Sequence, residues 1–177
     1  MSSSIDFIKS NVDFVQRAFK MANKDLNDDQ LHFVPPGQSH SIAWVMWHAA
    51  RIQDLFLNTL FQGKPQEWDT GGWAAKTGLP EKGFGTGMSN EDAANVRIKD
   101  LDAFNQYARK VDADMQAFFD TLSEDDLSRE VKLGERVETL GESINLHLVT
   151  HLNGHRGEVN LIRGMLGFDP VLPNQGG

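Results

Sequence analysis

The chain has 177 residues, of which 40% are hydrophobic and 24% are charged, and its formal net charge is −8. A chain of this size can enclose a hydrophobic core, so a single globular domain over residues 1–177 is expected. The acidic charge and the lack of a basic run argue against nucleic acid or anionic lipid as a partner. The absence of cysteine excludes disulfides, thiolate metal ligands and a cysteine nucleophile.

The sequence shows no targeting signal. Its first ten residues, MSSSIDFIKS, lack the apolar stretch and the cleavage site of a signal peptide. No apolar run approaches the roughly 20 residues needed to cross a bilayer, so no membrane partner is expected. The default expectation is a soluble cytoplasmic protein.

Apolar residues spaced three and four apart predict two amphipathic helices in the first third of the chain. The first helix runs from Ile5 to about Met21, and the sequence VPPGQS then interrupts the helical pattern. Ser39 is the expected N-cap of the second helix, which runs to about Phe61. His48 lies in the middle of the apolar stripe of this second helix.

Residues 62–89 form a long connection that holds seven of the 16 glycines and three large aromatic residues, Trp68, Trp73 and Phe84. Long connections are often functional, so these aromatics are candidates for the wall of a binding pocket. The alternative is that the segment only packs on the end of the helices. The stretch GFGTG lacks the strand and the Lys–Ser/Thr ending of a phosphate loop, and it is interpreted as plain loop.

Two capping boxes predict the remaining long helices. Ser89 with Asp92 opens a third helix that extends to about Leu122. An acidic connection follows, in which REVKL has the pattern of a short strand. Thr139 with Glu142 opens a fourth helix, which ends near Gly167. The pattern therefore predicts an all-α fold, a four-helix bundle whose long second connection lets the third helix run parallel to the second.

Three of the six histidines are candidate metal ligands, because they lie on inner helix faces. His151 and His155 lie four residues apart on the inner face of the fourth helix, and His48 lies on the inner face of the second. Neutral imidazoles bind zinc, nickel, copper or iron, and three protein ligands leave one position open for water or substrate. The alternative is that they are hydrogen-bonded core residues. The other three, His32 and His40 at the surface and His147 on a similar helix face, are not expected to be ligands.

The sequence excludes a zinc protease of the H-E-x-x-H type. Residue 152 is leucine, so the helical glutamate that acts as the base in those enzymes is missing. No nucleophile elbow, P-loop or dinucleotide-binding motif occurs either.

Two stretches resemble the DinB/YfiT-like family. SIAWVMWHAARIQD, at 41–54, is similar to the family's helix-2 motif, and HLNGHRGEVNLIRGML, at 151–166, is similar to its helix-4 motif of His-x3-His-Arg-Gly-Gln. GGWAAKTGLP and GTGM resemble a loop of some DinB-like members. The resemblance extends from LNDDQL to about residue 167.

The resemblance implies an up-down-down-up four-helix bundle with a divalent metal on three histidines, which map onto His48, His151 and His155. Zinc or nickel is expected first, with iron or manganese as alternatives. Family members include transferases and isomerases that use low-molecular-weight thiols, and others are described as metal-dependent hydrolases. Homodimers are frequent in the family.

One residue departs from the family motif. Glu158 stands where the family has glutamine, one turn past His155. Its carboxylate could orient a ligand histidine, bind the metal or act as a catalytic base. It could equally be a solvated charge near the helix end.

Three hypotheses follow for the function. The first is a metal-dependent enzyme acting on a small-molecule substrate, either a hydrolase or a transferase whose thiol comes from a cosubstrate. The second is a metal-binding or small-molecule-binding protein without turnover. The third is an interaction module whose histidines bind nothing.

Overall fold

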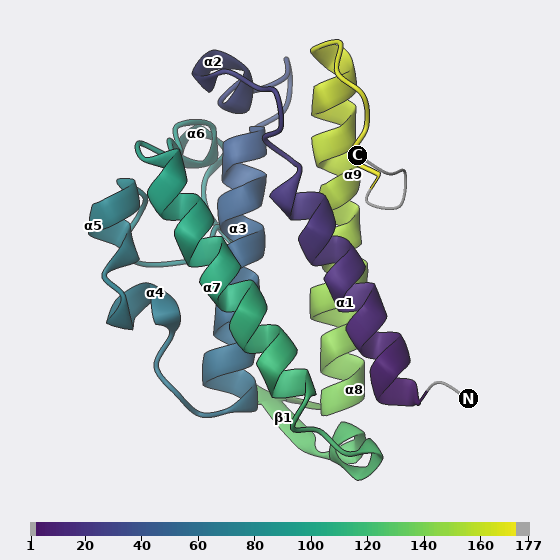
Figure 1. The fold of residues 1–177 in the computed structure, drawn as a ribbon. Helices are drawn as coiled ribbons and strands as arrows, with labels where there is room; N and C mark the ends of the chain where they lie inside the picture. Colours follow the sequence, from purple (N-terminus) through teal and green to yellow (C-terminus); the bar gives the residue numbers. More distant parts are fainter. Residues whose placement is uncertain (1–2, 173–177) are drawn as a thin grey trace.

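The computed structural model describes residues 3–172, and this part of the chain is mostly helical with one two-stranded sheet (Figure 1). The all-α class is therefore confirmed, and the predicted domain of 1–177 includes a few residues outside the described range. The elements, in chain order, are α1 (Ser4–Lys20), α2 (Asp28–Leu31), α3 (Ile42–Asp54), η1 (Leu55–Phe61), α4 (Glu67–Thr70), α5 (Trp73–Thr77), α6 (Asn90–Ala94), α7 (Leu101–Phe119), η2 (Glu124–Ser128), β1 (Glu130–Leu133), β2 (Arg136–Thr139), α8 (Leu140–Ser143), η3 (Ile144–Thr150) and α9 (His151–Met165).

Two of the long helices are composite. The segment η1 is a π-helical continuation of α3, so the second predicted helix does reach Phe61. In the same way, α8, the π-helical η3 and α9 follow one another without interruption. The capping box of Thr139 and Glu142 is present at the start of α8, as predicted. The N-cap of α3, however, is Ser41 and not Ser39, because the Ser41 hydroxyl accepts the hydrogen bond from the Trp44 backbone N–H.

The helix α3 lies at the centre of the fold. It packs against α7 and α9, while α1 packs against the same two helices (Figure 1). All 13 residues of α3 are buried, including the polar residues His48, Arg51, Gln53 and Asp54. Buried polar side chains favour hydrogen-bond partners within the protein, and those of Arg51, Gln53 and Asp54 connect α3 to other segments.

The third predicted helix, 89–122, is wrong as a single element. Ser89 does cap a helix, but α6 ends at Ala94 and the chain is not helical again until α7. A tertiary contact holds the interruption, because the Ile98 backbone N–H donates to His32 Nε2 at 3.0 Å. His32 is only 7% exposed, so its predicted surface location is also wrong. The Asp100 side chain then caps α7 by accepting from the Ala103 N–H.

A β-hairpin joins α7 to the last long helix. The strand expected at REVKL is β1, which pairs antiparallel with β2, with Leu133 opposite Arg136. The hairpin lies at one end of the helices, beside η1. No helix among residues 3–172 is long and apolar enough to cross a membrane.

Candidate metal centre

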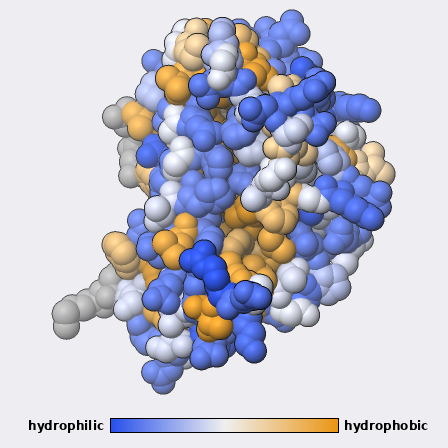
Figure 2. Space-filling model, turned by 180° about the vertical axis from the view of Figure 1, so that it is seen from behind, coloured by the Kyte–Doolittle hydropathy of each residue, from blue (hydrophilic) through white to orange (hydrophobic). Residues whose placement is uncertain are grey.

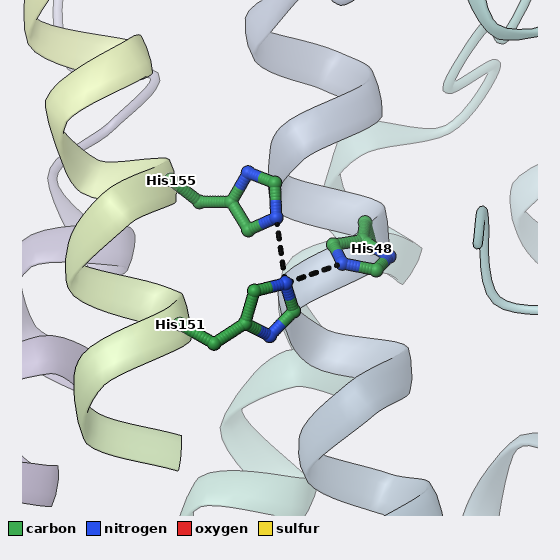
Figure 3. Close-up of side chains that lie close together, drawn as sticks. All are labelled: His48, His151 and His155. Carbon is green, nitrogen blue, oxygen red and sulfur yellow. Dashed lines mark hydrogen bonds between the residues drawn. The ribbon is translucent and has the colours of Figure 1, made fainter. Parts of the chain in front are cut away.

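Three histidine side chains from two helices converge at one point between α3 and α9 (Figure 3). The Nε2 atom of His151 lies 2.9 Å from Nε2 of His155 and 3.4 Å from Nε2 of His48. One ring nitrogen from each residue lies within 4.8 Å of the other two. The i, i+4 spacing places His151 and His155 on one face of α9, and the packing of α3 brings His48 opposite them.

The outer nitrogens of His48 and His155 contact oxygen atoms that only accept hydrogen bonds. His48 Nδ1 lies 2.5 Å from the carbonyl oxygen of Phe84, and His155 Nδ1 lies 3.2 Å from Oε2 of Glu158. The Nδ1 atoms must therefore carry the protons. This tautomer leaves the Nε2 lone pairs directed into the cluster, as in metal sites where a second contact orients each ligand.

Burial favours the uncharged form of two of the three rings, those of His48 and His151. Burial lowers the pKa of His48 to about 4, and the nearby rings of His155, His151 and His40 add to the effect. Burial also lowers the pKa of His151. Both imidazoles are therefore neutral near pH 7, which is the form that binds metal ions.

Glu158 lies behind the cluster. Its Oε2 contacts Nδ1 of His155 at 3.2 Å and Nδ1 of His40 at 3.3 Å. Burial opposes ionisation of this carboxyl, but the hydrogen bonds from the two histidines lower its pKa overall. Of the roles considered from the sequence, this position favours orientation of a ligand histidine, because the carboxylate contacts the outer nitrogen of His155.

His40 was expected at the surface, but it is half-buried next to the cluster. Its ring stacks on Trp44 with the centroids 3.6 Å apart and the planes 5° from parallel. The signal that could have indicated this position is the spacing of eight residues, about two helical turns, between His40 and His48. Together, His40 and His155 hold Glu158 from two sides.

The long connection reaches the cluster through its backbone. Besides the Phe84 carbonyl, Gly85 packs closely on α3, with a φ of +95°. A Cβ atom on Gly85 would lie 2.9 Å from Trp44 Cζ2 and 3.0 Å from His48 Nδ1. Within the loop GFGTG, it is therefore Gly85 that allows the backbone to approach His48.

Arg51, one turn after His48 on α3, holds this part of the connection. Its guanidinium donates to the Gly83 carbonyl at 3.1 and 3.3 Å and to Gln66 Oε1 at 2.8 Å. The same guanidinium lies 4.7 Å from the ring of Trp68. Because Gly83 directly precedes Phe84, Arg51 helps to place the carbonyl that contacts His48.

Asp54 anchors the first part of the connection. Its fully buried carboxylate accepts from the backbone N–H groups of Glu67 and Trp68 at 2.9 and 2.8 Å. It also accepts from the Tyr107 hydroxyl of α7 at 2.9 Å. The charged pair of Arg51 and Asp54 on a mostly apolar helix is the sequence signal that could have revealed this anchoring.

The three residues predicted to form a pocket wall do not line the same cavity. Phe84 lines a cavity of about 700 Å³ that His151 also lines. Trp68 instead lines a different cavity, of about 600 Å³, which shares no lining residue with the first. Trp73 donates its indole N–H to Glu67 and lies near Tyr107, so it does not line the cavity beside the histidines.

His147 lies in the same cavity as His151 and not in the cluster itself. Its Nε2 is 3.0 Å from Oε2 of Glu138, and its ring stacks on Phe56 with the centroids 4.5 Å apart. This packed position agrees with the expectation that His147 is not a metal ligand.

We predict that Gly85→Ala destabilises the protein more than Gly87→Ala. Both glycines have positive φ, but a Cβ at Gly87 meets nothing within 4 Å. The difference in free energy of unfolding, measured by chemical denaturation, should be at least about 1 kcal/mol, the scale of an overpacked contact. Equal losses would show that the approach of Gly85 to His48 is not tightly packed.

Comparison with known proteins assigns the family. A crystal structure described as a conserved protein from Enterococcus faecalis aligns with a TM-score of 0.75 and 20% identity, covering 93% of this chain and 99% of that one, which shows a shared fold. No curated protein matches significantly. The family model of the DinB superfamily matches residues 11–159, which include α3, the long connection and both histidines of α9. The chain therefore belongs to the DinB superfamily.

Proposed function

We propose that His48, His151 and His155 bind one divalent metal ion through their Nε2 atoms. The observation that carries this proposal is the convergence of the three ring nitrogens. Two nitrogens bound to one tetrahedral zinc ion at roughly 2.0–2.1 Å would be about 3.4 Å apart. The separations of 3.4 and 2.9 Å are close to that value. Zinc or nickel fits three imidazoles best, and iron or manganese is the alternative.

Two further features support this assignment. Burial keeps His48 and His151 neutral, and acceptor oxygens hold the protons of His48 and His155 on the outer nitrogens.

We further propose that the four long helices form the up-down-down-up bundle that the family resemblance implies. In support, Figure 1 shows the chain entering α3 and α7 at the same end of the molecule.

On this basis the protein is a metal-dependent enzyme, either a transferase of a low-molecular-weight thiol or a hydrolase. A bound ion of this kind lowers the pKa of a water or thiol that coordinates it. The protein residues hold the ligands in place: Phe84 and Glu158 orient His48 and His155. A transferred thiol must come from a cosubstrate, because the chain has no cysteine.

A second candidate is a binding protein without turnover. One observation favours it: the two carboxylates near the cluster are already engaged. Glu158 contacts the outer nitrogens of His155 and His40, and Glu138 contacts His147. Neither meets the Nε2 atoms of the three ligands, so a general base would have to be supplied by the substrate or by movement of one of these groups.

We predict about one equivalent of divalent metal per chain in protein purified without a nickel column, measured by elemental mass spectrometry. His48→Ala and His155→Ala should each lose most of this metal, because two remaining imidazoles bind far more weakly. His147→Ala is the matched control and should retain it, since His147 contacts Glu138. Unchanged metal content in the His48 and His155 variants would contradict the proposal.

Two assays of metal-loaded protein test for catalysis. The first measures transfer of bacillithiol, mycothiol or glutathione to electrophiles, and the second measures hydrolysis of a set of ester and amide substrates. We expect turnover that disappears in His48→Ala. Glu158→Gln should keep measurable turnover and lower metal affinity by up to about tenfold, because it retains a hydrogen-bond acceptor for His155. Metal binding with no reaction in any assay would favour the binding protein instead.

A further inference from the structure

The cavity beside the histidines is formed largely by apolar side chains. It has a volume of about 700 Å³, within the range of small-molecule sites. Its lining residues are Ile52, Leu55, Phe56, Leu60, Phe84, Thr86, Leu133, Gly134, Arg136, Leu146, His147 and His151. Figure 2, which views the molecule from the side opposite to Figure 1, shows an apolar hollow surrounded by hydrophilic surface.

Both π-helical segments contribute to this cavity. The segment η1 follows the helix of His48 and supplies Leu55, Phe56 and Leu60. The segment η3 directly precedes His151 and supplies Leu146 and His147. π-Helical turns are rare and occur frequently at functional sites. Here the two segments extend the ligand-bearing helices and form facing parts of one cavity wall.

The apolar wall is open to solvent. Leu146 is 44% exposed, and Leu55, Leu60 and Leu133 are only partly buried. Together they leave an apolar surface uncovered next to a metal-binding cluster. An exposed apolar concavity of this kind favours a ligand with an apolar body.

The charge of the cavity is positive. Arg136 is the single arginine or lysine among the residues that line it, and no carboxylate lines it. Arg136 is 76% exposed in its side chain, and its Nη2 is 3.6 Å from Oε1 of Glu138, beyond hydrogen-bond distance. Its guanidinium forms no hydrogen bond with residues 3–172, so its N–H groups remain available to an anion.

Glu138 does not offset this preference. Its side chain is only 8% exposed, and its Oε2 is already bonded to His147 at 3.0 Å. Its Oε1 has no hydrogen-bond partner but is buried, with the exposed guanidinium of Arg136 3.6 Å away, so burial keeps this carboxylate from a cationic ligand. The arrangement favours anions over cations.

We propose that this cavity binds the substrate of the histidine site, and that it selects molecules with an apolar body and one anionic group contacted by Arg136. This inference rests on the proposed function only in naming the bound molecule as the substrate. His151 and Arg136 line the same cavity, so both are accessible to one ligand bound in it.

Isothermal titration with three eight-carbon probes tests the selection: octanoate, octan-1-ol and octylammonium. We expect octanoate to bind more tightly than octylammonium, both to the protein as purified and after chelator treatment, with folding checked by circular dichroism. The chelated sample matters because a carboxylate could otherwise bind the metal. Arg136→Gln should weaken octanoate binding about fivefold, the scale of one exposed ion pair, and leave octan-1-ol unchanged.

Two variants make the test specific. Lys132→Gln removes an equal charge from the same hairpin at an exposed position that does not line the cavity, and it should change nothing. Leu146→Glu places a negative charge on the cavity wall and should weaken octanoate more than octylammonium. Equal octanoate affinity in Arg136→Gln and the unmodified protein, or equal binding of octanoate and octylammonium, would overturn the proposal.

The metal content of the same samples separates this inference from the proposed function. Charge-selective binding that depends on Arg136, in protein that contains no metal as purified and takes up none from added zinc, would support the cavity and contradict the metal site. Metal bound by the histidines with no charge-selective probe binding would contradict the cavity and leave the metal site supported.

Discussion

The buried carboxylate of Asp54 joins the parts of the structure that create the site. A fully buried charge is costly unless hydrogen bonds satisfy it, and Asp54 accepts four: from Glu67, Trp68, Tyr107 and Asn58. These bonds connect α3, the long connection and α7. Since the same helix carries His48, the connection is held at a defined place relative to the three histidines.

The effect of this anchoring reaches the cluster through Arg51 and Phe84. Arg51 bonds the Gly83 carbonyl, and the next residue supplies the carbonyl that contacts His48 Nδ1. On the other helix, Glu158 performs the corresponding task for His155. Thus a main-chain carbonyl and a carboxylate each orient one imidazole toward the same point. The contact of the Phe84 carbonyl with His48 gives the long connection a role in this site.

Local patterns predicted the parts of the fold that depend on local physics. The 3.6-residue period placed His48, His151 and His155 on inner helix faces, and Thr139 with Glu142 marked a true helix start. The interruption before α7 could not be predicted this way, since it depends on a contact between Ile98 and His32, 66 residues apart.

The contacts around the three histidines also could not be predicted from residue patterns. The Phe84 carbonyl is a backbone group that any residue would provide, and only the flanking glycines indicate a close approach. Large aromatic residues such as Trp68 and Trp73 are typical of a pocket wall. Asp54, however, anchors α4 so that Trp68 lines a different cavity. For Glu158, the sequence left several roles open, and its contact with His155 Nδ1 favours the orienting one.

The central claim is that one metal ion is shared by three Nε2 atoms from α3 and α9. Its most direct test is a crystal structure of zinc-loaded protein with an anomalous difference map recorded at the zinc edge. We expect one strong peak at roughly 2.0–2.1 Å from Nε2 of His48, His151 and His155. A map with no peak between these rings, or with zinc bound through Glu158 and His40 instead, would contradict it.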